Sequence, residues 1–153
     1  MEEKYSLRFR ICNWIYGNQL RVWLYEVCYS LYNVSYYNIH KFRNSIWESR
    51  ASFDKILFNI NYVTDRLHYI MKSEHIINGD YISKPFALRF RICNLIYGDQ
   101  LRNVLAVDMA ALYDIYQHLI RLQFNEDIPE IYFNKIKEVI SDINNIMYKK
   151  GKL

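Results

Sequence analysis

The sequence predicts an all-α protein, because of its composition, its helical periodicity and an internal repeat. The 153-residue chain is 52% hydrophobic and 24% charged, a balance typical of a globular protein with a substantial core. It contains only four Gly and two Pro, whereas a β-sandwich or β-barrel needs many turn residues. Its apolar residues recur at intervals of three and four, the spacing of one face of an α-helix.

A near-identical segment occurs twice in the chain. Residues 7–21 read LRFRICNWIYGNQLR and residues 88–102 read LRFRICNLIYGDQLR, so thirteen of fifteen positions agree. Weaker similarity follows each segment, first at the same offset of 81 and then at an offset of 80, where Phe53 matches Phe133. Such self-similarity indicates a duplicated structural unit. Each unit has the length of two helices and a turn.

We therefore predict a four-helix bundle made of two tandem helical hairpins related by a pseudo-twofold axis. The hairpins span about 6–76 and 87–150, a linker over 77–86 joins them, and residues 1–153 form a single domain. At about 1.5 Å per residue, an unbroken first helix would be about 60 Å long, too long for a compact domain of this size. Either the first and third helices break, the first around Asn33–Asn38, or the bundle is elongated and intertwined in a dimer.

The second helix of each unit carries one apolar stripe, which we assign to the core. The first stripe consists of Phe53, Ile56, Leu57, Ile60, Val63, Leu67, Ile70 and Met71, and the second of Phe133, Ile136, Ile140, Ile143 and Met147. Ser45 with Glu48 has the spacing of a capping box at the start of such a helix. Asp127 with Glu130 is expected to serve the same purpose in the second unit.

The first helix of each unit is apolar on two opposite flanks, so we expect packing neighbours on both. In the first unit one flank holds Ile11, Ile15 and Val22, and the other holds Phe9, Tyr16 and Leu20. A polar ridge lies between the flanks. It consists of Arg10, Asn13, Gly17 and Arg21, and is copied as Arg91, Asn94, Gly98 and Arg102.

The polar residues of the repeated segments and the tyrosine in each form the candidate site. It comprises Arg8, Arg10, Asn13, Tyr16, Gln19, Arg21, Arg89, Arg91, Asn94, Tyr97, Gln100 and Arg102. In one interpretation the helices cross at Gly17 and Gly98, since glycine inside a helix costs about 1 kcal/mol relative to alanine, and the Asn and Gln side chains satisfy one another or nearby backbone groups. In the other, the arginines form a symmetric basic surface for phosphates or acidic side chains. The flanking apolar residues favour the first, and the exposure of the arginines distinguishes the two.

Residues that would support catalysis or metal binding are sparse. The four histidines form no HExxH motif and no cluster with cysteine at metal-ligand spacing. Asp65 and His68 have the spacing of a di-iron carboxylate–histidine element, but such sites need that element twice, and the second unit has no equivalent histidine. Cys12, Cys28 and Cys93 are expected to be reduced and buried. We therefore predict no enzyme activity, no cofactor and no metal site.

With catalysis and metal binding disfavoured, we expect the chain to function by binding. We predict a non-enzymatic interaction protein that self-assembles as a homo-oligomer or binds a protein partner. The alternative is a nucleic-acid-binding protein whose two arginine-rich segments clamp phosphates, which the net charge of +4 permits without favouring.

Hydropathy indicates where the protein is located, and amino-acid composition indicates what kind of genome encodes it. No apolar run approaches the roughly 18 residues of a membrane span, and the first residues lack the apolar core of a signal peptide. We therefore expect no membrane partner and a cytoplasmic location. Tyr, Ile and Asn, which AT-rich codons encode, are frequent, and this indicates an AT-rich genome such as that of a bacterium, phage, virus or protozoan. We attribute the 15 tyrosines to that composition rather than to a stacking surface.

Overall fold

The computed structural model describes residues 5–40, 46–73, 85–122 and 127–148. These residues form the six helices α1 (Leu7–Ile15), α2 (Leu20–His40), α3 (Ile46–Lys72), α4 (Leu88–Ile96), α5 (Gln100–Leu119) and α6 (Glu130–Met147). Within these ranges the only β-type pairing is an isolated bridge between Tyr5 and Tyr148. The predicted all-α class is therefore confirmed.

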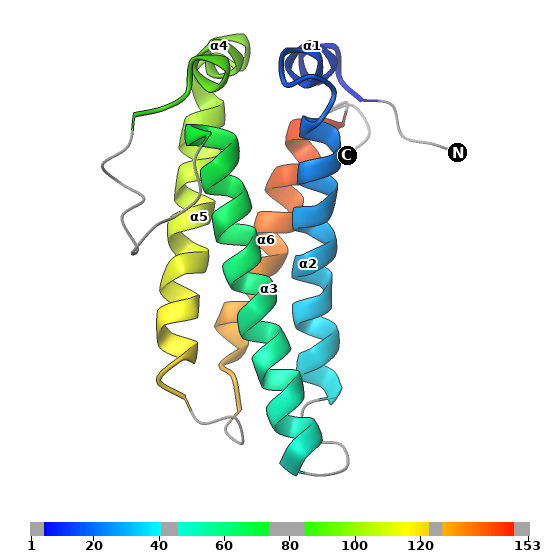
Figure 1. Ribbon diagram of the computed structural model, residues 1–153, viewed down its shortest axis with the longest axis vertical. Helices are drawn as coiled ribbons and strands as arrows, with labels where there is room; N and C mark the ends of the chain where they lie inside the picture. Colours follow the sequence, from blue (N-terminus) through cyan, green and yellow to red (C-terminus); the bar gives the residue numbers. More distant parts are fainter. Residues whose placement is uncertain (1–4, 41–45, 74–84, 123–126, 149–153) are drawn as a thin grey trace.

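The four long helices run side by side, and the two short helices lie across one end of them (Figure 1). α2 packs against α3 and α6, and α5 packs against the same two helices, so the four surround a common core. α1 and α4 contact each other at the end of the molecule that they cover. None of the described helices combines the length and apolar content that a bilayer crossing requires.

The break in each long helical stretch lies at the glycine of the repeat. Gly17 and Asn18 have φ of 63° and 65°, and Gly98 and Asp99 both have φ of 63°. Two successive left-handed residues end an α-helix, and Gly, Asn and Asp adopt that conformation most readily. The prediction of a break around Asn33–Asn38 was wrong, because that stretch lies inside the unbroken α2.

The two glycines are not points of close helix approach. A Cβ atom added at Gly17 or Gly98 would have no heavy atom within 4 Å. The prediction that helices cross there was therefore wrong. These glycines serve the turn itself, because an L side chain is strained at positive φ.

An asparagine restarts the helix after each turn. The Asn13 Oδ1 accepts a hydrogen bond from the backbone N–H of Arg21 at 2.9 Å, and the Asn94 Oδ1 accepts one from Arg102 at 2.8 Å. Backbone N–H groups in the first turn of a helix have no partner within the helix. The repeated asparagines thus satisfy nearby backbone groups, as the structural interpretation of the ridge expected.

Only one of the two predicted flanks is buried along its whole length. Phe9, Tyr16 and Leu20 are buried, whereas Ile11 and Val22 are 42% and 39% exposed. Ile15, the third member of that flank, is half-buried and packs against the core. The prediction of neighbours on this flank was therefore wrong for Ile11 and Val22, because a helical wheel drawn through residues 7–22 assumes one straight axis, and the chain turns at Gly17. The outer sides of α1 and α2 therefore carry apolar side chains without covering partners among the described residues.

The apolar stripes of α3 and α6 form much of the core, as predicted. Apart from the half-buried Leu57 and Phe133, every member of the two stripes is buried. The outcome for the two predicted capping boxes is different. Ser45 and the Glu48 side chain lie outside the described residues, and α6 begins after Pro129 with no side-chain cap, so Asp127 does not cap it.

Equivalent backbone hydrogen bonds occur in the two predicted units, but at a different offset from the predicted one. The Ser6 N–H donates to the Met147 carbonyl at 3.0 Å, and the Ala87 N–H donates to the Met71 carbonyl at 2.9 Å. Ser6 and Ala87 are 81 residues apart, but Met71 and Met147 are 76 apart. α3 and α6 therefore match one helical turn away from the predicted offset of 80. Stripes that repeat every three to four residues match nearly as well after a shift of one turn.

Candidate functional site

The two copies of the repeated segment meet at a pair of cysteines. Cys12 of α1 and Cys93 of α4 are fully buried, and their side chains share a hydrogen bond. That bond, together with the charge of Arg8, lowers the pKa of Cys12 although burial opposes the shift. The same bond, followed by burial, raises the pKa of Cys93. Burial alone raises the pKa of Cys28 to about 11. All three cysteines are free and buried, as predicted.

An arginine from each copy stacks on a tyrosine of the other. The Arg8 guanidinium lies 4.6 Å from the centroid of the Tyr97 ring, and that of Arg89 lies 4.4 Å from the centroid of Tyr16. Each tyrosine is buried, and its hydroxyl donates a hydrogen bond of 2.6 Å to a backbone carbonyl near the end of α3 or α6. Burial raises the pKa of both phenols above the ordinary value. These four predicted site residues hold the helices together.

The other four arginines of the candidate site face solvent. Arg10, Arg21, Arg91 and Arg102 are exposed, and within the described residues their side chains form no hydrogen bond or ion pair. They lie on α1, α4 and the first turns of α2 and α5, hence at one end of the molecule (Figure 1). Their exposure agrees with the basic-surface interpretation. Gln19 and Gln100 are exposed as well, so they do not satisfy one another in a buried seam.

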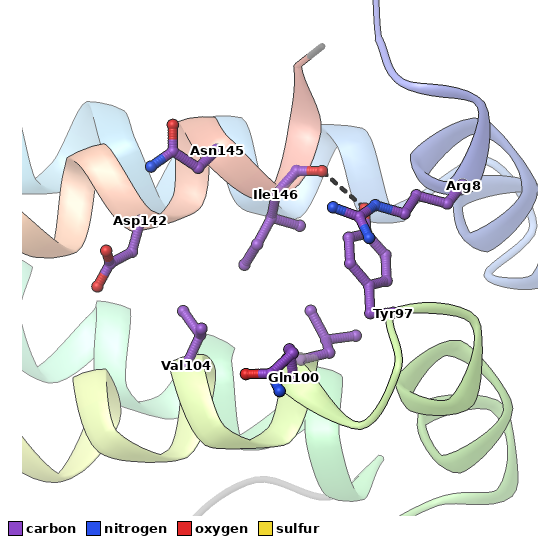
Figure 2. A pocket seen from close by; sticks show the side chains of 8 residues that line it. Arg8, Tyr97, Gln100, Val104, Asp142, Asn145 and Ile146 are labelled. Carbon is purple, nitrogen blue, oxygen red and sulfur yellow. Dashed lines mark hydrogen bonds between the residues drawn. The ribbon is translucent and has the colours of Figure 1, made fainter. Parts of the chain in front are cut away.

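A pocket of about 180 Å³ opens between α5 and α6 beside Arg8 (Figure 2). Its lining consists of Arg8, Tyr97, Gln100, Leu101, Val104, Asp142, Asn145 and Ile146. Asp142 and Val104 point into the space between the two helices, and Arg8 lies at the opposite end from Asp142 (Figure 2). The repeat analysis identified Arg8, Tyr97 and Gln100. It missed Asp142 and Asn145, because α6 lies outside the repeated segments.

A buried carboxyl lies behind this pocket. Asp108 of α5 is only 2% exposed, and it shares a hydrogen bond with Asp142. Burial, then the hydrogen bond and negative charge of Asp142, raise the pKa of Asp108 to about 8, although Lys135 opposes the shift. This raised pKa favours the protonated form of Asp108 near neutral pH.

An exposed aromatic surface runs along α2. This tyrosine face consists of Val22, Tyr25, Tyr29, Tyr32 and Tyr36, each between 39% and 65% exposed. The steps of three and four residues keep the five side chains on one side of the helix, opposite the buried Leu24, Val27 and Leu31. From sequence alone these tyrosines were attributed to genome composition, so the face was not predicted. Their heptad-like spacing is the signal that could have found it.

The equivalent face of α5 is different. At an offset of 81, the tyrosine face corresponds to Asn103, Ala106, Ala110, Tyr113 and Gln117, which include a single large aromatic side chain. The tyrosine face therefore belongs to α2 alone and does not simply follow from the duplication.

The described residues contain no group of three or more His, Cys, Asp or Glu side chains that could hold a metal ion. A second pocket, of about 400 Å³, lies between α5 and α6 farther from the repeated segments and includes His118, Tyr132 and Glu138. Comparisons with family models, curated proteins and solved structures found no match to this chain.

Proposed function

We propose that this chain is a non-enzymatic interaction protein that associates with a second copy of itself through the tyrosine face of α2. We further propose that it is a four-helix bundle of two tandem hairpins related by a pseudo-twofold axis, capped at one end by α1 and α4. The observation that carries the functional proposal is the row of exposed, regularly spaced aromatic side chains on a helix otherwise committed to the core.

Tyrosine suits a surface that is exposed to water in the free protein and buried when a partner binds. Its ring buries a large apolar area with few rotatable bonds, and its hydroxyl keeps a hydrogen-bond partner in either state. From Val22 to Tyr36 the face extends over about 21 Å, at about 1.5 Å per residue. That length is enough for several turns of a helix–helix contact.

A second copy fits this face because the face carries no charge. A chain with a net charge of +4 repels itself, but none of the five positions is ionic at neutral pH. The nearby Glu26 is turned toward Arg66 and Tyr62 of α3, at 4.0 Å and 3.2 Å respectively. Two antiparallel α2 helices related by a twofold axis near Tyr29 would place the tyrosines of the two copies against one another, with Val22 opposite Tyr36 at each end.

Sedimentation equilibrium of the full chain tests the proposal. The wild-type protein is expected to form a dimer at micromolar concentration, and the Tyr29→Glu, Tyr32→Glu double variant is expected to be monomeric, because four buried charges would face one another in the dimer. Both side chains are exposed, so circular dichroism should show unchanged helicity.

The second repeat provides the matched control. Asn103 and Ala110 are exposed on α5 at the positions equivalent to Val22 and Tyr29. The Asn103→Glu, Ala110→Glu double variant adds the same charge to the equivalent side and should remain dimeric. A monomeric wild-type protein, or a dimer that survives glutamate at Tyr29 and Tyr32, would contradict the proposal.

Nucleic-acid binding is the second candidate, favoured by Arg10, Arg21, Arg91 and Arg102, which are exposed and have no hydrogen-bond or ion-pair partner for their side chains in the part of the chain that the structure describes. A two-site phosphate clamp predicts binding to single-stranded RNA or DNA that weakens steeply as salt is raised, because bound counterions are released. The Arg10→Ala, Arg91→Ala variant should lose most of the affinity. Binding that is absent at low salt, or insensitive to salt and to these substitutions, would remove this candidate.

A further inference from the structure

The pocket beside Arg8 has an equivalent location in the first repeat, and there aromatic rings fill it. Contacts repeat at an offset of 81 for α1, α2, α4 and α5, and at 76 for α3 and α6. By these offsets Val104 corresponds to Trp23, Asn145 to Tyr69, and Asp142 to Arg66. The three replacements are the observation on which the inference depends.

In the first repeat the Trp23 ring lies among aromatic and cationic groups. Its centroid is 6.0 Å from that of Tyr16 and 5.4 Å from that of Tyr69, with edge-to-face geometry in both pairs. The guanidinium carbons of Arg89 and Arg66 each lie 5.6 Å from the centroid of the Trp23 ring. Edge-to-face ring pairs and cations over an indole face are both attractive.

The second repeat retains the tyrosine and the arginine of this arrangement but lacks the other two aromatic rings. Tyr97 takes the place of Tyr16, and Arg8, stacked on Tyr97, takes the place of Arg89. Where the indole of Trp23 would lie there is only the small side chain of Val104, and where Tyr69 would lie there is Asn145. The pocket of about 180 Å³ is therefore the space that the missing rings leave.

We propose that this pocket binds a small flat aromatic molecule that carries an ammonium or N–H donor and takes the position that the Trp23 ring has in the first repeat. This inference rests on the proposed repeat relationship but is independent of the proposed dimer. The guest ring lies beside Arg8 and Tyr97, and its donor points toward Asp142, whose side chain reaches into the space between α5 and α6 (Figure 2).

The replacement of Arg66 by Asp142 determines the chemistry of the guest. In the first repeat the Arg66 cation lies over the indole of Trp23, whereas in the pocket the carboxyl of Asp142 takes the equivalent position. Oxygen acceptors favour a guest with N–H groups or positive charge at that end. Leu101, Val104 and Ile146 supply the apolar surface that an aromatic ring needs.

Calorimetric titration of the full chain with tryptamine and with indole tests the proposal. Both probes should bind at millimolar concentration or better, and tryptamine should bind more tightly because its ammonium reaches Asp142. The Asp142→Asn variant should weaken tryptamine by about tenfold and indole much less, since one charge interaction is removed.

The Val104→Trp variant recreates the side chain of the first repeat and should abolish binding of both probes. Its matched control is Val107→Trp, which places the same ring at an exposed position of α5 outside the pocket and should bind like the wild type. Thermal unfolding identifies any variant that fails to fold. If Val104→Trp does not fold, the comparison of tryptamine binding by the wild type and by Asp142→Asn still tests the proposal.

Three results would overturn the inference. These are no binding of either probe to the wild type, undiminished binding to a folded Val104→Trp variant, or equal affinity of tryptamine for the wild type and Asp142→Asn. The same titration on the Tyr29→Glu, Tyr32→Glu variant separates this site from the proposed dimer interface, because binding should persist in the monomer.

Discussion

At the scale of single residues, backbone conformation and burial explain side chains that the repeat alone left ambiguous. Gly17 and Gly98 were candidates for helix crossing, yet open space surrounds both. Their positive φ is the feature that demands glycine. Tyr16 and Tyr97 were candidate ligands for a partner, yet both are buried and bonded to a backbone carbonyl.

Substitution of the turn glycine tests its conformational role. Gly17→Ala should lower the free energy of unfolding by about 1 kcal/mol, because alanine is strained at positive φ although no neighbour clashes with its methyl group. Gly17→Asn should lower it less, since asparagine tolerates this conformation. Urea denaturation measures both. A loss several times larger for alanine would indicate steric crowding instead.

Asp108 predicts a pH dependence of stability. The pKa of Asp108, about 8 in the folded chain against an ordinary 3.8, means that its stabilising effect is complete below about pH 4 and is lost as pH rises to about 8. Asp108→Asn should therefore be more stable than the wild type by up to about 5 kcal/mol at pH 8, and by at most about 2 kcal/mol at pH 5. Urea denaturation at the two pH values measures this.

The exposed Asp114 on the same helix is the matched control for Asp108. Asp114→Asn should leave the difference in stability between pH 5 and pH 8 as it is in the wild type. Equal pH dependence of Asp108→Asn and the wild type would contradict the assignment. Besides Asp142, the charged neighbours that act on Asp108 are Lys135 and Glu138.

At the scale of elements, each repeated segment is a short helix, a left-handed turn and the start of a long helix. The asparagine of the short helix satisfies a backbone N–H in the first turn of the long one. This arrangement explains why the asparagine, the glycine and the Asn or Asp that follows the glycine occur together in both copies. The sequence alone shows this spacing but cannot separate a helix restart from a ligand-binding ridge, because both use polar side chains on one face.

Removal of the asparagine tests the restart. Asn13→Ala should lower the free energy of unfolding by about 1 kcal/mol, the usual loss when a polar group at a helix start is replaced by alanine. Asn94→Ala should show a similar loss, because Asn94 makes the equivalent bond. Asn13→Asp should retain most of the stability. If both alanine variants unfold like the wild type, the hydrogen bonds do not contribute.

At the scale of the whole molecule, the two predicted units are joined by reciprocal contacts. The start of α1 is bonded to the end of α6, and the start of α4 follows a bond to the end of α3. Cys12 meets Cys93, and each copy supplies an arginine to a tyrosine of the other. Neither half therefore completes its own core.

This mutual dependence predicts a single unfolding transition. Urea curves followed by circular dichroism and by tryptophan fluorescence should coincide, because most of the large buried side chains belong to one continuous core. Two separate transitions would show that the halves are independent domains. The same measurement tests the prediction that residues 1–153 form one domain.

The amino-acid sequence by itself determined the helical class, the duplication and the stripes that α3 and α6 bury, since these depend on local composition and periodicity. Only the tertiary structure decided which ends of α3 and α6 bond to the starts of α4 and α1, the exposure of Ile11 and Val22, and the pocket beside Arg8 and Val104. Periodicity is unchanged by a shift of one helical turn and does not show where a helix axis bends. Register and exposure are set by contacts between segments distant in the chain, which no local pattern contains.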